Sequence, residues 1–222
     1  MTHGRMDWQR ALWQNRAEAG AQLADRLAQW NHDANAIVIG LPRGGIVVAA
    51  EVAKRLHLPL KSWAVRKLSH PSNPELALGA IAPGGVLIWD EPFERLDPEQ
   101  RQQLVQQQQQ ELLRRQQLYG DPAPQSLKNH PLIVVDDGVA TGLTVRAALR
   151  SLEQTAPQRL ILAVPVIDQQ IARALRPMVH ELVALAEVTN LWAVGSWYQH
   201  FEAVADDQVI RLLNKADATG CR

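Results

Sequence analysis

The amino-acid sequence predicts an α/β protein with a mainly parallel central sheet flanked by helices. The run Leu132 to Val135 is apolar and mostly β-branched, which is typical of a central strand that is covered on both faces. Apolar stretches alternate with amphipathic ones along much of the chain, as βαβ units require. Because 222 residues suffice for one α/β domain with a substantial core and are few for two, we expect a single domain over residues 1–222.

The composition excludes several classes of protein. Lysine plus arginine equals aspartate plus glutamate, at 23 each, so no global basic field favours nucleic acid or an anionic membrane, and any anion site must be local. The single cysteine, Cys221, excludes an intrachain disulfide and a thiolate metal cluster. No signal-peptide pattern begins the chain, and no stretch approaches the ~20 apolar residues that span a bilayer. These features predict a soluble, cytoplasmic protein without nucleic-acid or membrane partners.

The first predicted unit is helix, strand, loop and helix. Ala19, Leu23, Leu27 and Trp30 recur at spacings of three and four, which predicts an amphipathic helix over residues 15–30 that packs on the sheet. An apolar strand over residues 36–41 and a helix over GIVVAAEVAKRL follow.

The PRGG sequence between that strand and that helix suits an anion. Arg43 supplies a permanent forked cation, while Gly44 and Gly45 free the backbone for close contact. Pro42 cannot extend a central strand. The alternative interpretation is an ordinary strand-to-helix turn with a surface arginine.

The next predicted strand spans residues 59–68, and its end carries Arg66 and Lys67. Three prolines and three glycines between Pro71 and Gly85 then favour a mobile loop and a short hairpin rather than core. A solvated strand end is the alternative interpretation of Arg66 and Lys67.

The segment over residues 91–124 is predicted to be an insertion built around one helix. Asp97, Pro98 and Gln100 supply a helix cap, a first-turn proline and a capping-box residue, and the helix is expected to end near Leu118. Val105, Leu112 and Tyr119 recur every seven residues, as in a coiled coil, but the other heptad positions that a coiled coil needs apolar are mostly glutamine or arginine. A surface helix or lid is therefore favoured over a coiled coil.

A phosphate site is predicted where the strand Leu132 to Val135 ends. Asp136 and Asp137 follow that strand, and a loop of small and hydroxyl-bearing residues leads into a helix with Val145, Leu149 and Leu152 on its apolar face. The amides at the start of that helix lack intrahelical partners and carry partial positive charge, which suits a phosphate. The P-loop and dinucleotide fingerprints are missing, and a ribose 5-phosphate fits both the acids and the loop. The structural alternative is an Asx-rich turn at the end of a core strand.

Two more strands, over residues 159–167 and 181–186, flank a short helix over residues 168–175. Trp192 and Trp197 follow the last strand, where ligands of open α/β sheets bind, and either could stack on a planar acceptor. Packing in a terminal hood is the alternative. A helix over residues 206–213 and a frayed tail complete the expected chain.

The apolar strand, the acidic pair and the loop ending Thr-Gly-Leu-Thr resemble the phosphoribosyl pyrophosphate (PRPP) motif of type I phosphoribosyltransferases. The resemblance implies that the two acids meet the ribose 2- and 3-hydroxyls, that the loop holds the 5-phosphate, and that the PRGG loop receives pyrophosphate, often with a non-proline cis peptide that the sequence cannot show. The PRPP-binding residues are then Arg43, Gly44, Gly45, Asp136, Asp137, Gly138, Val139, Ala140, Thr141, Gly142, Leu143 and Thr144. The catalytic residues are Asp136, Asp137, Arg43, Arg66 and Lys67, and the acceptor-binding residues are Trp192 and Trp197.

The implied activity is that of a glycosyltransferase of nucleotide metabolism, which transfers the phosphoribosyl group from PRPP to a nitrogenous small molecule and releases pyrophosphate. Mg²⁺ would be carried by PRPP, without direct protein ligands. Ala140 stands where members that use hypoxanthine or guanine place an acid, so a 6-oxopurine acceptor is disfavoured.

Two other functions stay open at this point. A PRPP-binding regulatory protein without turnover is the leading alternative, although a neutral chain shows no basic operator-binding surface. A hydrolase of PRPP-like esters lacks a distinguishing motif. The acceptor, the general acid or base and the oligomeric state, for which a homo-oligomer is one alternative, are not determined by the sequence.

Overall fold

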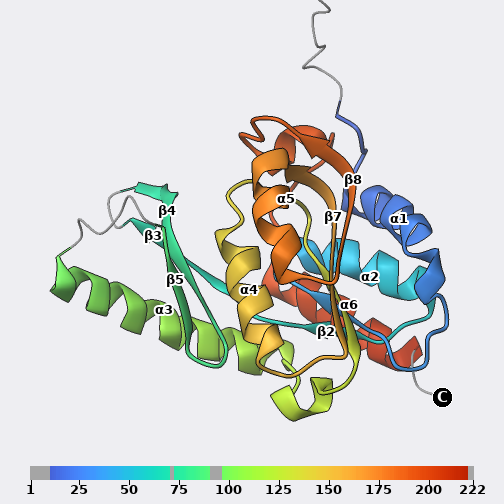
Figure 1. The fold of residues 1–222 in the computed structure, drawn as a ribbon, viewed down its shortest axis with the longest axis horizontal. Helices are drawn as coiled ribbons and strands as arrows, with labels where there is room; N and C mark the ends of the chain where they lie inside the picture. Colours follow the sequence, from blue (N-terminus) through green and yellow to red (C-terminus); the bar gives the residue numbers. More distant parts are fainter. Residues whose placement is uncertain (1–10, 71–72, 91–96, 220–222) are drawn as a thin grey trace, which may run out of the picture.

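A five-stranded parallel sheet forms the centre of the molecule, which is a computed structural model that describes residues 11–70, 73–90 and 97–219 (Figure 1). The strand order is β2–β1–β6–β7–β8. The strands are β1 (Ile37–Gly40), β2 (Leu60–Ser62), β6 (Pro131–Val135), β7 (Arg159–Asp168) and β8 (Glu181–Val188). The helices are α1 (Arg16–Arg26), α2 (Gly44–Leu56), α3 (Pro98–Tyr119), α4 (Leu143–Glu153), α5 (Gln169–Leu175) and α6 (Asp206–Thr219), with 3₁₀ turns η1 (Ala28–Trp30), η3 (Pro124–Leu127), η4 (Arg176–Met178) and η5 (Val194–Trp197). The predicted fold class is confirmed.

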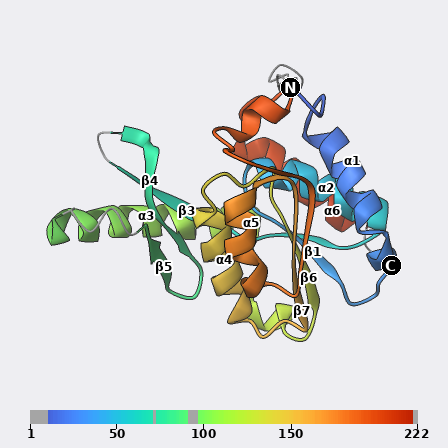
Figure 2. The same cartoon turned by 45° about the horizontal axis from the view of Figure 1, so that its top comes forward.

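Helices cover both faces of this sheet (Figure 2). Ile133 and Val135 pack in one core with residues of α1, α2 and α6. Leu132 and Val134 point to the opposite face and pack with residues of α4 and α5. All of β6 is buried, because successive side chains of a strand point to opposite faces and here both faces are covered.

A second, antiparallel sheet, whose strands lie between residues 66 and 89, is called the hood below. Its structure corrects two predictions. The chain leaves the parallel sheet at Trp63, so the strand predicted over residues 59–68 divides into β2 and β3 (Arg66–His70). Strands β4 (Asn73–Ala82) and β5 (Val86–Trp89) complete the sheet in the order β3–β4–β5. The expectation of a loop rather than core was wrong for residues 73–82, since Leu78 and Ala80 are fully buried. The expected short hairpin is present, because β4 and β5 pair antiparallel across a turn at residues 83–85. Gly79 permits the pairing of β4 with β5, because a Cβ there would lie 2.2 Å from the carbonyl oxygen of Ile88.

The predicted insertion helix is α3, which packs along the hood in Figure 1. The side chain of Asp97 caps its start by accepting a hydrogen bond from the amide of Glu99 (3.1 Å), and Gly120, in the left-handed conformation, ends it. Leu104 and Leu112 are buried against the hood, so one face of this helix is core rather than surface. Residues 91–96, where the predicted insertion begins, lie outside the described residues.

Helix α6 corrects the expected end of the fold. It continues to Thr219, six residues beyond the predicted end at Leu213, and it packs against α2. Among the residues that the structure describes, no helix combines the length and apolar character needed to cross a bilayer.

Asp121 joins the end of α3 to the point where the chain passes into the hood. Its carboxylate accepts hydrogen bonds from the Ser62 hydroxyl and from the amide of Ala64 (2.7 Å), and burial raises the pKa of Asp121 from 3.8 to about 6. Since the folded state then binds the proton more tightly than the unfolded chain, this group's contribution to stability is full below about pH 4 and is lost as the pH rises through about 6.

We expect Asp121→Asn to flatten this pH dependence. The difference in the free energy of unfolding between parent and variant should change by about 3 kcal/mol between about pH 4 and pH 7, as measured by urea denaturation. Asp217→Asn is the matched control, because Asp217 is 59% exposed and pairs with Lys61 of the neighbouring β2. Parallel curves for the parent and Asp121→Asn would contradict the assignment.

Candidate active site

Two motifs that lie far apart in the sequence leave the central sheet side by side. Strands β1 and β6 are neighbours, with Gly40 opposite Val135, and the amide of Leu41 donates to the carbonyl of Val135 (2.9 Å). The PRGG loop and the acidic pair therefore meet at the carboxyl end of the sheet, where open α/β folds bind their ligands.

The two glycines of the PRGG loop are required by the closeness of the acids. A Cβ on Gly44 would lie 1.9 Å from Oδ2 of Asp137. A Cβ on Gly45 would lie 2.8 Å from Oδ1 of Asp136 and 2.9 Å from the carbonyl oxygen of Val135. The peptide bond between Pro42 and Arg43 is cis.

These contacts predict different results for two similar substitutions. Gly44→Ala meets the end of a side chain, so the carboxylate of Asp137 should be displaced and PRPP affinity should fall about tenfold or more, with a loss of stability only where Arg16 loses its hydrogen bond to Oδ2 of Asp137. Gly45→Ala meets the backbone carbonyl of Val135, so overpacking should lower the free energy of unfolding by about 1 to 3 kcal/mol. Thermal denaturation and calorimetric PRPP titration of both variants check this, and equal effects on both measurements would contradict it.

Asp137 is held by a buried arginine from the first helix. Nε of Arg16 donates to Oδ2 of Asp137 at 2.7 Å, and the two side chains are only 10% and 15% exposed. Arg16 also donates to the carbonyl of Glu202 (3.0 Å), and its guanidinium lies 3.6 Å from the ring centre of Phe201. The hydroxyl of Tyr198 donates to the backbone carbonyl of Asp137 (2.6 Å). The position of Asp137 is thus fixed by two segments distant in sequence.

The two carboxyl groups have unequal surroundings. Burial raises the pKa of Asp136 well above its usual value, and the charge of Asp137 raises it further, while the amide of Asp137 donates to its Oδ1 (2.8 Å). Burial also raises the pKa of Asp137, although Arg16 opposes that shift. A ligand that brings hydroxyl donors or positive charge would stabilise the ionised pair.

The loop after the acids is anchored to strand β7. The amide of Val139 donates to the carbonyl of Val166 (2.9 Å), and the amide of Asp168 donates to the carbonyl of Val139 (3.0 Å). Gly142, at φ 74°, turns the chain into α4. Thr141 is exposed and Thr144 is half-buried, beside the free amides of the first helical turn.

The predicted cations lie on different elements. Arg43 is 41% exposed and pairs with Asp206 at 3.6 Å. Arg66 begins β3 rather than ending a strand, and it donates to Oε1 of Gln108 on α3 (2.7 and 3.1 Å). Lys67 is exposed and points to the other face of the hood, because neighbouring residues of a strand alternate. The structure therefore separates Arg66 from Lys67, which the sequence grouped together.

The predicted acceptor residues also differ from each other. Trp192 is 91% exposed, whereas Trp197 is half-buried and packs against a cluster that includes Trp13 and Tyr198. The 3₁₀ turn η5, in which Trp197 lies, covers the loop after the acids, since a Cβ on Gly138 would lie 2.4 Å from a methyl group of Val194.

Sequence reasoning missed Arg16 as a partner of the acidic pair. A signal was present, because Arg16 stands three residues before Ala19 and seven before Leu23, on the buried stripe of the helix. A charged residue in such a stripe needs a partner of opposite charge. Across the residues with described coordinates, no group of three or more histidine, cysteine, aspartate or glutamate side chains could hold a metal ion.

This arrangement of sheet, acidic pair and glycine loop defines a class of α/β proteins, and comparison with known proteins identifies the class. Residues 14–195 match the phosphoribosyl transferase domain family. The chain is 39% identical over 213 residues to two Mycobacterium tuberculosis proteins, of strains CDC 1551 / Oshkosh and H37Rv, each named "putative phosphoribosyl transferase". These matches cover 92% of this chain and 47% of the relative, so the chain spans about half the length of the curated relatives it matches.

A solved structure agrees over nearly its whole length. The crystal structure of TT1426 from Thermus thermophilus is 36% identical in sequence, with a TM-score of 0.72, and the match covers 91% of this chain and 98% of that chain. The chain belongs to the phosphoribosyl transferase domain family.

Proposed function

We propose that this protein binds PRPP and transfers its phosphoribosyl group to a nitrogenous small molecule with release of pyrophosphate. The observation that carries the proposal is the meeting of the PRGG loop with the acidic pair, in which Gly44 and Gly45 leave room for Asp137 and Asp136. The described residues would form one phosphoribosyltransferase unit, with α3 as its insertion. Because the chain spans about half of its curated relatives, the proposal concerns this unit alone.

Each part of the proposed site has a separate task. Asp136 and Asp137 would accept hydrogen bonds from the ribose hydroxyls and stabilise the positive charge that develops on the ribose as the C1–pyrophosphate bond breaks. The loop from Gly138 to Thr144 would hold the 5-phosphate. Arg43 and Arg66 would face the leaving group, whose charge is also neutralised by Mg²⁺ that enters as part of the substrate. Lys67 points to the other face of the hood and is not given this role.

The acceptor is proposed to bind next to η5, with Trp197 and Trp192 as candidate contacts. Ala140 provides no carboxylate for a base proton and packs against the cluster of Tyr198 and Trp13. The search for an acceptor should therefore extend beyond 6-oxopurines.

The decisive experiment incubates the protein with PRPP, Mg²⁺ and pooled nucleobases and amines. Pyrophosphate release is followed, and products are identified by mass. Acceptor-dependent release that is absent in Asp136→Asn/Asp137→Asn supports the transferase. Tight PRPP binding without turnover across the pool would instead support the PRPP-binding regulator, and the absence of PRPP binding would refute both.

A further inference from the structure

Four arginines from three elements gather where α3 passes the PRGG loop. Arg43 and Arg114 share one carboxylate, that of Asp206, at 3.6 and 3.1 Å. Burial lowers the pKa of Arg66, and the nearby charge of Arg115 lowers it further, as do those of Arg43 and Arg114. We name Arg43, Arg66, Arg114 and Arg115 the arginine cluster.

The arginine cluster carries more positive than negative charge. Two carboxylates, Glu111 and Asp206, pair with three of its four guanidinium groups. The fourth, that of Arg66, donates to Gln108. Because the whole chain has a formal net charge of zero, this excess is a local feature. A local cationic site is what binding of a small anion requires in a neutral protein.

Helix α3 holds its two arginines in fixed positions. Glu111 accepts hydrogen bonds from Arg114 (2.7 and 3.0 Å) and from Arg115 (2.9 Å). Hydrogen bonds from Arg114 and Arg115 lower the pKa of Glu111 to about 2, so this carboxylate stays ionised at neutral pH. The Arg115 side chain is only 13% exposed.

A cleft opens beside these groups. It has a volume of about 470 Å³ and is lined by Arg66, Glu111 and Arg114, with glutamines of α3 completing the wall. Guanidinium forks and glutamine amides are donors that fit phosphate oxygens.

We propose that the arginine cluster is a diphosphate-binding site in which α3 contributes Arg114 and Arg115, and in which Asp206 is an internal counter-ion that a bound diphosphate displaces from Arg43. The Arg43–Asp206 pair suits this exchange, because its side chains are 41% and 31% exposed and such pairs are weak. Asp206 keeps other partners after displacement, since it also accepts from Arg114 and from the Tyr119 hydroxyl (2.7 Å). The inference rests on the proposed function in so far as the diphosphate is that of PRPP or the released pyrophosphate.

The test is calorimetric titration of inorganic pyrophosphate with Mg²⁺, and separately of ribose 5-phosphate and PRPP, into single variants. Arg114→Gln and Arg115→Gln should each lower the affinity for pyrophosphate about tenfold and leave the affinity for ribose 5-phosphate unchanged. Asp206→Asn should raise the affinity for pyrophosphate about threefold or more, and this gain should become smaller as the salt concentration rises. The matched controls are Arg211→Gln and Asp207→Asn, which break an exposed ion pair on the same helix as Asp206 and should change nothing.

The outcomes separate this inference from the proposed function. If both α3 variants bind pyrophosphate like the parent while PRPP binds the parent, the arginine cluster is refuted and the transferase proposal stands. If the parent binds no PRPP but binds pyrophosphate through Arg114 and Arg115, the transferase proposal fails and the diphosphate site stands. Unchanged or weaker pyrophosphate binding by Asp206→Asn refutes the counter-ion role. Should Arg115→Gln fail to fold, Arg115→Lys keeps the charge without the fork and should still lose affinity.

Discussion

Replacement of both Asp136 and Asp137 by asparagine is expected to lower the affinity for PRPP by roughly a hundredfold to ten-thousandfold. Each carboxylate is assigned a charge-assisted hydrogen bond to a ribose hydroxyl, and the loss of two such bonds costs roughly 3 to 6 kcal/mol. Asparagine keeps the shape of each side chain, so the glycines of the PRGG loop still fit. Calorimetric titration of PRPP and ribose 5-phosphate measures the loss of affinity. A pH of about 8 is chosen because Asp136 and Asp137 of the parent are more fully ionised there than at neutral pH.

Asp168→Asn is the matched control for this double variant. Asp168 also ends a strand of the central sheet, but its carboxylate accepts hydrogen bonds from the amides of Gln170 (2.8 Å) and Leu191 (3.2 Å). Loss of the Asp168 carboxylate should lower the free energy of unfolding and leave the affinity for PRPP unchanged. If the double variant binds PRPP and ribose 5-phosphate like the parent, the acidic pair is not the ribose site.

Much of the fold could be predicted because its signals are local. The apolar run before Asp136 marks a strand with two covered faces, and β6 has that environment. Asp97 and Pro98 mark a helix start that α3 uses. These patterns depend on residues within a few positions of each other.

The composition of the candidate site depends on contacts between distant residues, which periodicity does not reveal. Arg16 and Asp137 are 121 residues apart in the sequence. Arg66 begins a new strand because the chain leaves the parallel sheet at Trp63, and as neighbours on that strand Arg66 and Lys67 point to opposite faces of the hood. Proline and glycine counts predicted a mobile loop and a short hairpin over residues 71–85, but the pairing of β4 with β3 as well as with β5 made residues 73–82 a sheet strand.

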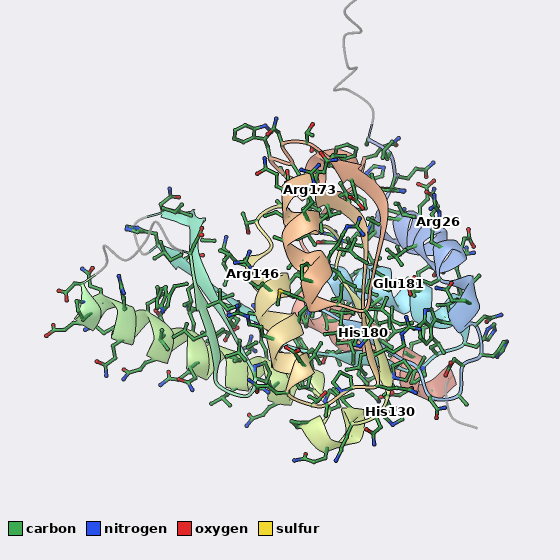
Figure 3. All side chains as sticks on the ribbon, viewed as in Figure 1. Arg26, His130, Arg146, Arg173, His180 and Glu181 are labelled. Atoms are coloured by element: carbon green, nitrogen blue, oxygen red, sulfur yellow. The ribbon has the colours of Figure 1, made fainter. Side chains whose placement is uncertain are left out.

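The second large effect is expected from Arg16→Met, which removes the cation that compensates Asp137. Breaking a buried ion pair by removing one partner should lower the free energy of unfolding by about 3 to 5 kcal/mol at neutral pH, as measured by urea denaturation. Methionine is the chosen replacement because it keeps a long apolar side chain beside the ring of Phe201, on which the guanidinium of Arg16 lies. Arg26→Met is the control, since Arg26 lies on the same helix and is exposed (Figure 3).

The pH dependence of Arg16→Met distinguishes lost charge compensation from lost packing. Arg16 is the strongest influence that lowers the pKa of Asp137 against burial, so without Arg16 the pKa of that carboxyl should rise further above its usual value. A raised pKa in the folded state means that stability is retained at low pH and lost as the pH rises through that pKa, so the defect should be larger at pH 8 than at pH 5. Adding Asp137→Asn removes the uncompensated charge, so the double variant should lose less than the two single variants together. A defect that is equal at both pH values and strictly additive with Asp137→Asn would show that Arg16 acts through packing alone.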